Sequence, residues 1–346
     1  MIMFQDVTVE ELLAMLEKGE TALIDVRSPS EYEDSTIPGS VNIPLFDDAE
    51  RAEIGTLYKQ VSVDAAKDRG LEIVSRKLPD FIRSIEAAGP PRKAVFCWRG
   101  GMRSRTSATL ASLIGMKMLR LSGGYRAYRK WVVDTLEHLA ELPPIYVING
   151  FTGTGKTELL DRLEAMGYPV VNLERMAEHR GSIFGHIGRS PNNQKTFEAL
   201  LVHTLLRLKH APYLLIEAES KRVGKAVLPE FLVEAKERGT QLFIDLPMER
   251  RVANIIADYK PEEHKEASMR SFERIEKRMH TPVAAEVRSA LQEERYEDAV
   301  RLLLIHYYDP RYRHATEQYE SGRIHIQAAD TDDALRQVIA HLPPLQ

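Results

Sequence analysis

The sequence is poor in cysteine, in long apolar runs and in net charge. Its 346 residues include a single cysteine, Cys97, which excludes an intramolecular disulfide and a cysteine-based metal cluster. No apolar run approaches the roughly 20 residues that a membrane-spanning helix needs. The N-terminal stretch has acidic residues where a secretory signal peptide has basic ones. We therefore expect a cytoplasmic protein with no membrane partner, and we expect a monomer.

The composition is that of a soluble globular protein, with 43% hydrophobic and 28% charged residues. The chain is long enough for two domains of ordinary size. Segments typical of strands and helices alternate in both halves, which predicts an α/β fold with parallel sheets. We predict a first domain over residues 1–137, a Pro-containing linker over 138–144, and a second domain over 145–346. Its region 248–314 is mainly helical by pattern.

Apolar runs and capping residues locate the individual elements. A helix is expected after a Thr8 cap, where Glu11 completes a capping box. Two more helices are predicted over 105–116 and 156–167. Buried strands are predicted over 21–26, 93–98, 118–124, 144–150, 168–173, 213–218, 241–247 and 323–328.

The only cysteine lies between a predicted strand and a predicted helix. A glycine-rich loop at that place aims backbone N–H groups and a helix N-terminus at the sulfur, and so stabilises a thiolate and binds tetrahedral oxyanions. We therefore interpret Cys97 as a nucleophile; the alternative is an inert buried thiol. The predicted anion loop consists of Trp98, Arg99, Gly100, Gly101, Met102, Arg103 and Ser104.

Residues on both sides of this loop resemble a rhodanese domain. The stretch LIDVRSPSEYEDSTIPGSVNIPL precedes Cys97 and LSGGYRAYRKW follows it, so the resemblance covers about residues 4–137. It implies a domain that carries sulfur or a related element on the thiolate. The Cys-x5-Arg spacing is longer than that of most small sulfurtransferases and equals that of cysteine-dependent phosphatases, which favours a phosphate-bearing donor. Asp25 and Arg27 are expected to form a structural ion pair.

The basic residues are concentrated around the cysteine. Between Arg92 and Lys130 there are ten Lys and Arg residues and no Asp or Glu, although the net charge of the chain is −4. Such a block is either a solvated basic face or an anion-binding surface. Because it surrounds Cys97, we interpret it as an anion-binding surface.

The second half begins with the P-loop sequence GFTGTGKT, after a strand and at the start of a helix. Backbone N–H groups of such a loop surround a diphosphate, Lys156 neutralises its oxygens, and the Thr157 hydroxyl is a possible Mg²⁺ ligand. The motif does not say which diphosphate binds. The predicted diphosphate-binding residues are Gly150, Thr152, Gly153, Thr154, Gly155, Lys156 and Thr157.

Several charged residues are candidates for contacts to the substrate beside the P-loop. An acidic partner of Thr157 is sought at the end of a strand, and Glu217, Glu219 and Asp245 are equal candidates. His179 and Arg180 lie in a polar, glycine-containing segment that is typical of a substrate-facing loop. Arg250 and Arg251 either close over a leaving diphosphate or are solvated.

The pairing of CWRGGMRS with GFTGTGKT in one chain resembles the tRNA 2-selenouridine synthase family. Segments ERAEIGTLYKQ, NLERMAEHRGSIFG and LIEAESKRVG are also similar, so the resemblance spans nearly the whole chain. It implies a transferase that converts wobble 2-thiouridine of Lys, Glu and Gln tRNAs into 2-selenouridine through S-geranyl-2-thiouridine. Its cosubstrates are geranyl diphosphate and selenophosphate, with Mg²⁺ possible and no permanent cofactor.

The residues fit this chemistry. A departing diphosphate needs the neutralisation that Lys156 supplies, and Cys97 is expected to attack selenophosphate at selenium before delivering selenium to the alkylated base. The sequence does not locate the geranyl pocket; the helical region 262–308, with Leu302, Leu303, Leu304 and Tyr307, is a candidate that reads equally well as helix core. The alternatives are an ATP-dependent P-loop kinase or NTPase, or a sulfurtransferase, with a rhodanese- or phosphatase-like cysteine domain. A sulfur-relay adaptor is a third reading, which leaves Lys156 unexplained.

Overall fold

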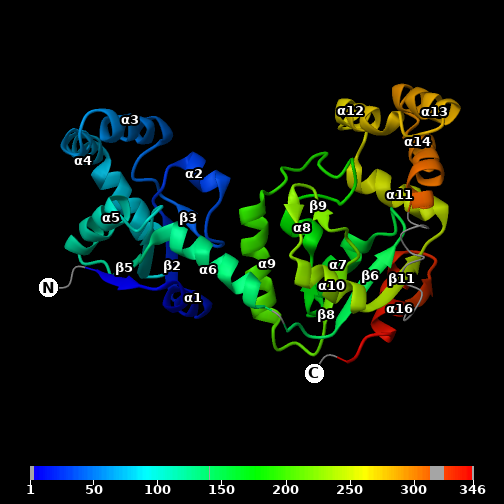
Figure 1. Ribbon diagram of the computed structural model, residues 1–346, viewed down its shortest axis with the longest axis horizontal. Helices are drawn as coiled ribbons and strands as arrows, with labels where there is room; N and C mark the ends of the chain where they lie inside the picture. The colour runs from blue at the N-terminus through cyan, green and yellow to red at the C-terminus, as the bar shows by residue number, and fades with distance from the viewer. Residues whose placement is uncertain (1–3, 140, 312–322, 345–346) are drawn as a thin grey trace. The chain divides into compact units, whose positions relative to one another are not determined.

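The structure is a computed structural model that describes residues 4–139, 141–311 and 323–344. The chain divides into two compact units, Met1–His138 and Leu139–Gln346 (Figure 1). Both units contain a parallel sheet with helices, which is the α/β fold that the sequence predicts. The last helix of the first unit ends at His138 and the first strand of the second begins at Ile145.

The first unit is built on a five-stranded sheet in the order β1-β5-β4-β2-β3, in which all paired strands are parallel. Apolar side chains fill its central strands, and Ile24, Val95 and Phe96 are fully buried. The carboxyl ends of parallel strands meet at one edge, so the loop after β4 emerges there beside the loop after β2. The strands are β1 (Gln5–Val7), β2 (Thr21–Asp25), β3 (Val41–Asn42), β4 (Arg92–Phe96) and β5 (Met118–Leu121).

Helices on this sheet start at the expected caps. Thr8 and Glu11 form the predicted capping box at the start of α1. The helix after the cysteine loop, predicted over 105–116, begins three residues earlier because the glycine turn ends at Gly101. The helices are α1 (Val9–Glu17), α2 (Pro29–Asp34), α3 (Asp48–Gln60), α4 (Val63–Ala87), α5 (Met102–Leu113) and α6 (Gly124–His138).

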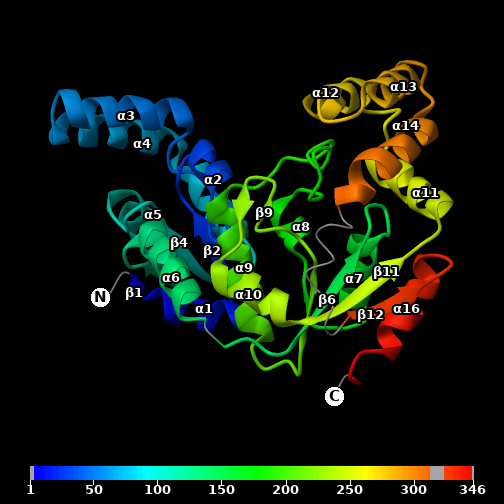
Figure 2. The same ribbon diagram turned by 45° about the vertical axis from the view of Figure 1, so that its right-hand side comes forward.

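The helices α3 and α4 form a hairpin that the sequence pattern did not reveal. They lie side by side in both views (Figures 1 and 2), joined by two residues. Asp47 and Ser62 cap their N-termini with side-chain hydrogen bonds. Only part of α4 is buried against the core, through residues such as Ile73, Phe81 and Ile85.

The second unit has a five-stranded parallel sheet in the order β12-β11-β6-β8-β7. The strand β6 lies between β8 and β11, so the chain after β6 emerges where the sheet order changes direction, which is where parallel sheets bind ligands. The strands are β6 (Ile145–Gly150), β7 (Val170–Val171), β8 (Leu214–Glu217), β11 (Thr240–Asp245) and β12 (Arg323–Gln327), with a separate antiparallel pair β9 (Arg222–Val223) and β10 (Ala226–Val227).

The region after β11 is helical, as expected, over the part that the structure describes. It runs from Met248 to residue 311, and residues 312–314 of the predicted region lie outside the described residues. The helices of the unit are α7 (Lys156–Ala165), α8 (Leu173–Ala177), α9 (Gln194–Leu208), α10 (Glu230–Arg238), α11 (Met248–Tyr259), α12 (Lys265–Glu276), α13 (Thr281–Gln292), α14 (Tyr296–Leu303), the π-helical η1 (Leu304–Tyr308) and α16 (Thr331–Ala340).

Candidate functional site

The single cysteine directly follows β4 and begins the loop that leads into α5. The Cys97 side chain is only 3% exposed and packs with apolar residues of α4 and α5. Its Sγ lies 3.2 Å from the hydroxyl of Ser104 in the first turn of α5. Of the predicted loop residues, Trp98, Arg99, Gly101 and Met102 are exposed, Gly100 and Arg103 are partly buried, and Ser104 is buried.

The cysteine loop is held against the glycine turn that follows β5. Gly124 has φ +61°, and a Cβ there would lie 2.2 Å from the carbonyl oxygen of Cys97. Gly100 has φ +63°, and its Cβ would lie 2.8 Å from the backbone nitrogen of Gly123. The Tyr125 N–H donates to the Cys97 carbonyl at 2.9 Å. Both glycines are therefore required for this close approach of two loops.

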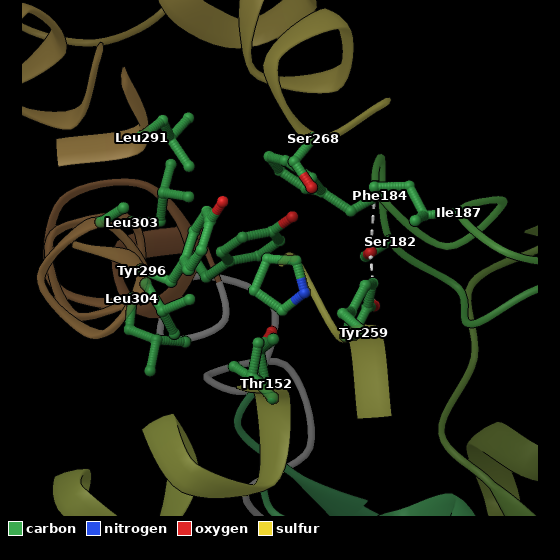
Figure 3. A pocket seen from close by; sticks show the side chains of 15 residues that line it. Thr152, Ser182, Phe184, Ile187, Tyr259, Ser268, Leu291, Tyr296, Leu303 and Leu304 are labelled. Carbon is green, nitrogen blue, oxygen red and sulfur yellow. Dashed lines mark hydrogen bonds between the residues drawn. The ribbon is translucent and has the colours of Figure 1, made fainter. Parts of the chain in front are cut away.

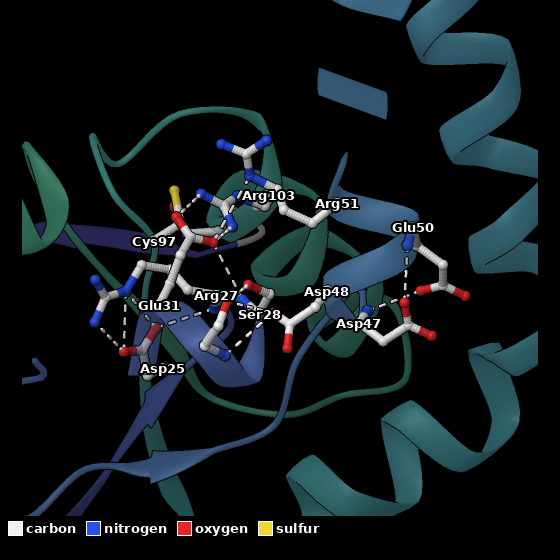
Figure 4. Close-up of polar contacts among 12 residues, drawn as sticks. Asp25, Arg27, Ser28, Glu31, Asp47, Asp48, Glu50, Arg51, Cys97 and Arg103 are labelled. Atoms are coloured by element: carbon white, nitrogen blue, oxygen red, sulfur yellow. Dashed lines mark hydrogen bonds and ion pairs between the residues drawn. The ribbon is translucent and has the colours of Figure 1, made fainter. Parts of the chain in front are cut away.

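Arg103 is paired with a carboxylate that the sequence analysis did not single out. Both Nη atoms of Arg103 donate to the carboxylate of Glu31 in α2, and the Nη2–Oε1 distance is 3.1 Å (Figure 4). The Nε atom of Arg51 lies 3.8 Å from the same carboxylate. Burial opposes both charged forms, yet the hydrogen bonds between them raise the pKa of Arg103 and lower that of Glu31. An incoming oxyanion therefore meets an Arg103 that already has a partner.

The expected ion pair between Asp25 and Arg27 is present and fully buried. The Arg27 Nε and Nη2 atoms donate to the two Asp25 oxygens at 3.0 and 2.6 Å. The guanidinium also lies over the ring of Tyr125, 4.4 Å from its centroid, and Nη2 donates to the Ser35 carbonyl. This pair joins the loop after β2 to the start of α6, which is a structural role.

The basic block over residues 92–130 is not the uniform basic face that the sequence suggested. Lys93 is buried and donates to three backbone carbonyls near the end of α4. Arg120 pairs with Asp6 at 2.7 Å, and Lys130 pairs with Asp134. Acidic residues from outside the block thus neutralise part of it. The exposed basic side chains of the block are Arg99, Arg105, Lys117, Arg126 and Lys130.

The P-loop in the second unit has the local geometry that its sequence predicts. Gly155 caps α7 with φ +73°, and Gly153 has φ +85°. A Cβ on Gly150 would lie 2.6 Å from the Ile244 carbonyl of the neighbouring strand. The Lys156 ammonium donates to the carbonyls of Gly150 and Phe151 at 3.0 and 3.2 Å, and burial lowers its pKa. Lys156 is therefore folded back over the loop.

The P-loop threonine contacts a carboxylate other than the three candidates. Thr157 donates from its hydroxyl to Glu174 at 2.5 Å. Glu174 follows the two-residue strand β7, whose carboxyl end lies beside that of β8, and its N–H donates to Glu217. The sequence places Glu217, Glu219 or Asp245 beside Thr157; in the structure the hydroxyl hydrogen bond goes to Glu174, and Glu217 lies behind it. The sequence signal for Glu174 is an acid directly after the strand YPVVNL, at the start of the segment that resembles a substrate-facing loop.

Glu217 and Glu219 belong to the same acidic cluster behind Glu174. Burial and then the charge of Glu174 raise the pKa of Glu217 well above its usual range and that of Glu219 to about 8. Lys236 is buried beside them and donates to the Glu219 carbonyl. These carboxyls thus retain protons at a pH where exposed glutamates are ionised. Asp245, at the end of β11, is half-buried.

The predicted substrate loop folds back on its own unit. Arg180 pairs with Asp258 at 2.8 Å, lies over the Tyr259 ring and donates to the Ile187 carbonyl at 2.7 Å. Burial, with a further effect of His186, lowers the pKa of His179. The Nδ1 atom of His179 is buried and has no hydrogen-bond partner among the residues that the structure describes. Arg180 therefore fixes the loop through its contacts with Asp258, Tyr259 and Ile187.

The two arginines after β11 have different surroundings. Arg250 is exposed. Arg251 is buried: its Nε donates to the Thr152 carbonyl of the P-loop at 2.9 Å, and both Nη atoms donate to Asp309. The sequence predicted that Arg251 closes over a diphosphate or is solvated. The structure shows neither arrangement, because the guanidinium is buried and donates to the backbone of the P-loop.

An apolar cavity opens beside the P-loop at Thr152. Helices α11, α13, α14 and η1 and the loop over 182–187 surround it (Figure 3). Its volume is about 60 Å³, its lining surface is mainly apolar, and the Ser182 hydroxyl is bonded to the Tyr259 hydroxyl at 2.9 Å. Of the candidate residues for a geranyl pocket, Leu303 and Leu304 line this cavity. Leu302 and Tyr307 instead pack into the core between α12, α13 and α14.

The fold and the two sites define a two-domain protein: a rhodanese-like cysteine domain followed by a P-loop domain. A Rhodanese-like domain profile matches residues 8–130, and the tRNA 2-selenouridine synthase AAA domain profile matches residues 143–342. The chain belongs to the tRNA 2-selenouridine synthase family, which confirms the resemblance drawn from the sequence.

Two relatives illustrate the match. The tRNA 2-selenouridine synthase of Pseudomonas syringae pv. syringae (strain B728a) is 33% identical over 93% of this chain and 94% of its own length. The synthase of the same name from Nitrosomonas europaea is 34% identical over 73% of this chain and 67% of its own length. Within the described ranges, no helix is long and apolar enough to cross a membrane. Those ranges also contain no group of three metal-ligating side chains placed to hold a metal ion.

Proposed function

We propose that this protein converts 2-thiouridine at the wobble position of tRNA into 2-selenouridine in two transferase steps. Geranyl diphosphate first alkylates the sulfur, and selenophosphate then supplies selenium. The names of the relatives support the overall conversion. The observation that supports a prenyl diphosphate is the P-loop opening directly on a narrow apolar cavity at Thr152. An apolar chain fits such a lining, whereas a nucleotide's polar base and ribose need hydrogen-bonding groups.

In the first step the thiouridine sulfur attacks the allylic carbon, an S–C bond forms, the C–O bond breaks and diphosphate leaves. Backbone N–H groups of the P-loop and the Lys156 ammonium stabilise the charge that develops on the leaving group. Lys156 reaches it by exchanging the carbonyls of Gly150 and Phe151 for phosphate oxygens. Thr157 and Glu174 fit a Mg²⁺ bound together with phosphates, which would add further neutralisation.

In the second step the sulfur-bound geranyl group turns C2 of the base into an electrophile. Selenium in selenophosphate is already at the oxidation level of selenide, so attack by Cys97 on selenium, as expected from the sequence, would expel phosphite and not phosphate. We therefore propose that selenium adds to C2 and geranylthiol leaves, which gives an Se-phosphorylated base. The Cys97 thiolate then attacks phosphorus, the P–Se bond breaks, and the base takes a proton as 2-selenouridine.

Water then hydrolyses the S-phosphocysteine to phosphate and free thiol, so atoms and electrons balance. The structure supports this role of the cysteine loop in two ways. Ser104 lies 3.2 Å from Sγ, where its hydroxyl can donate to the thiolate when that leaves phosphorus. Arg103, at the spacing of cysteine-dependent phosphatases, is positioned by Glu31 at the same loop. Phosphoryl oxygens would take over hydrogen bonds that Arg103 now makes to Glu31.

The test is mass analysis of nucleosides from thiolated tRNA after incubation with geranyl diphosphate, with and without selenophosphate. We expect Lys156→Ala to lose geranylation first, and Cys97→Ser to retain geranylation but form no 2-selenouridine. Cys97→Ser should still release about one geranylthiol per geranylated tRNA, because selenium addition precedes the thiolate step.

Three outcomes contradict the proposal. Full geranyl transfer by Lys156→Ala would remove the P-loop from the mechanism. Loss of geranylation in a folded Cys97→Ser variant with normal tRNA affinity would contradict the assignment of the two steps to two separate sites. Nucleotide hydrolysis without tRNA, in place of geranyl transfer, would identify a P-loop kinase or NTPase.

A further inference from the structure

A second apolar cleft lies in the first unit. It has a volume of about 720 Å³ and lies among α3, α4, the start of α5 and the segment before α3. Its apolar lining includes Leu45, Phe46, Ile54, Val63, Val74 and Met102. Neither the geranyl transfer proposed at the P-loop nor the selenium chemistry proposed at Cys97 uses this cleft.

Large apolar side chains of this cleft are exposed to solvent. Tyr58, Leu71 and Met102 are 58%, 71% and 58% exposed, and all three line it. Soluble proteins rarely leave a contiguous apolar surface of this kind uncovered unless it binds something. The hairpin of α3 and α4 also extends from the sheet (Figure 2), so that it forms one wall of the cleft.

The cleft adjoins the cysteine loop through α5 and the core. Met102 and Arg103 are the first two residues of α5, and both line the cleft. Cys97 packs in the same apolar cluster as Phe46 and Val74, which also line the cleft. A group reacting above Cys97 therefore has an apolar surface beside it.

The lining of the cleft also includes four basic side chains: Arg51, Lys59, Lys67 and Arg103. An apolar surface with basic residues suits a ligand that is apolar itself but is attached to an anion. A geranylated nucleotide in an RNA chain has this chemistry, because its ten-carbon chain is apolar and its neighbouring phosphates are negative.

We propose that the cleft among α3, α4 and α5 binds the geranyl chain of the S-geranylated base while C2 of that base lies at the Cys97 loop. The inference rests on the proposed function and adds a second apolar subsite, distinct from the cavity beside the P-loop. The cleft holds the chain during selenium addition and then releases geranylthiol. It thereby selects geranylated over unmodified tRNA for the second step.

The test compares two substrates on the full-length protein: anticodon stem-loop RNAs that carry S-geranyl- or S-methyl-2-thiouridine, each with saturating selenophosphate. The double variant Tyr58→Asp/Leu71→Asp places charge on the cleft, and Leu113→Asp is the control. Leu113 is 66% exposed on α5 and does not line the cleft. We measure kcat/KM for formation of 2-selenouridine.

We expect the wild type to favour the geranyl substrate by at least about tenfold, since each buried methylene contributes a factor of about four. The double variant should lose most of this preference, and the control should keep it. Because both RNAs are otherwise identical, the ratio is unaffected by a loss of RNA affinity or of folded protein.

Equal preference in the double variant and the wild type would overturn the inference, as would a wild type that does not distinguish the two substrates. A wild type that converts neither RNA would overturn the proposed function itself. These results are distinguishable within one experiment.

Discussion

Replacement of Arg251 should destabilise the P-loop unit and abolish geranyl transfer. The side chains of Arg251 and Asp309 are 5% and 13% exposed, and the pair is joined by two hydrogen bonds. Arg251→Ala leaves Asp309 as a largely buried charge without its partner, which costs about 3–5 kcal/mol. For a domain of this size that lowers Tm by about 6–20 °C. The Thr152 carbonyl also loses its donor at 2.9 Å, so the loop loses its support.

The assay is thermal unfolding followed by near-UV circular dichroism, with geranyl transfer measured on the folded fraction. Arg250→Ala is a matched control, because the neighbouring side chain is exposed and its removal should change stability by about 0.5 kcal/mol or less. The double variant Arg251→Met/Asp309→Leu should recover much of the stability, since it leaves no unpaired charge, but not the transfer activity. If Arg251→Ala and Arg250→Ala shift Tm equally, the reasoning about the buried pair is refuted.

Two further predictions concern the buried carboxyl of Glu219 and the glycine turn at Gly124. Because the pKa of Glu219 is raised to about 8 from 4.5, the folded protein holds a proton that the unfolded chain releases, so the free energy of unfolding falls as pH rises between these values. Glu219→Gln should flatten that slope in urea unfolding at pH 5 to 8; an unchanged slope contradicts the assignment. Gly124→Ala should disrupt the cysteine loop and abolish selenation while geranyl transfer persists, since its Cβ would lie 2.2 Å from the Cys97 carbonyl. Gly115→Ala is the control: Gly115 also has a positive φ, but in the described part of the chain a Cβ there would meet no atom within 4 Å beyond its own chain neighbours. Equal effects of the two substitutions would show that the collision has no role.

The features that the sequence predicted are those encoded over short distances. Thr8 with Glu11, the strand TALIDV, and the glycines of GFTGTGKT each place their chemistry within a few residues, so pattern and structure agree. Asp25 and Arg27 are likewise two residues apart, and their ion pair was expected.

The features that the sequence did not reveal depend on partners distant along the chain. Glu31 is 72 residues from Arg103, and Asp309 is 58 residues from Arg251. Glu174 contacts Thr157 only because a strand of two residues brings it to the edge of the sheet. The basic block looked uniform because the acids that neutralise it, such as Asp6, lie outside it. No local pattern reports such pairings, which the tertiary fold creates.

The carboxylate of Glu31 should weaken the binding of inorganic phosphate to the resting cysteine loop, because it occupies the donors of Arg103. Its helix fixes it with a capping box at Ser28, and it holds Arg103 as an internal anion would. Free phosphate must displace this carboxylate from Arg103. In the proposed mechanism the phosphoryl group is attached to the tRNA, so its binding to the loop costs less entropy. In the proposed mechanism, the same competition by Glu31 favours release of the phosphate product from Arg103.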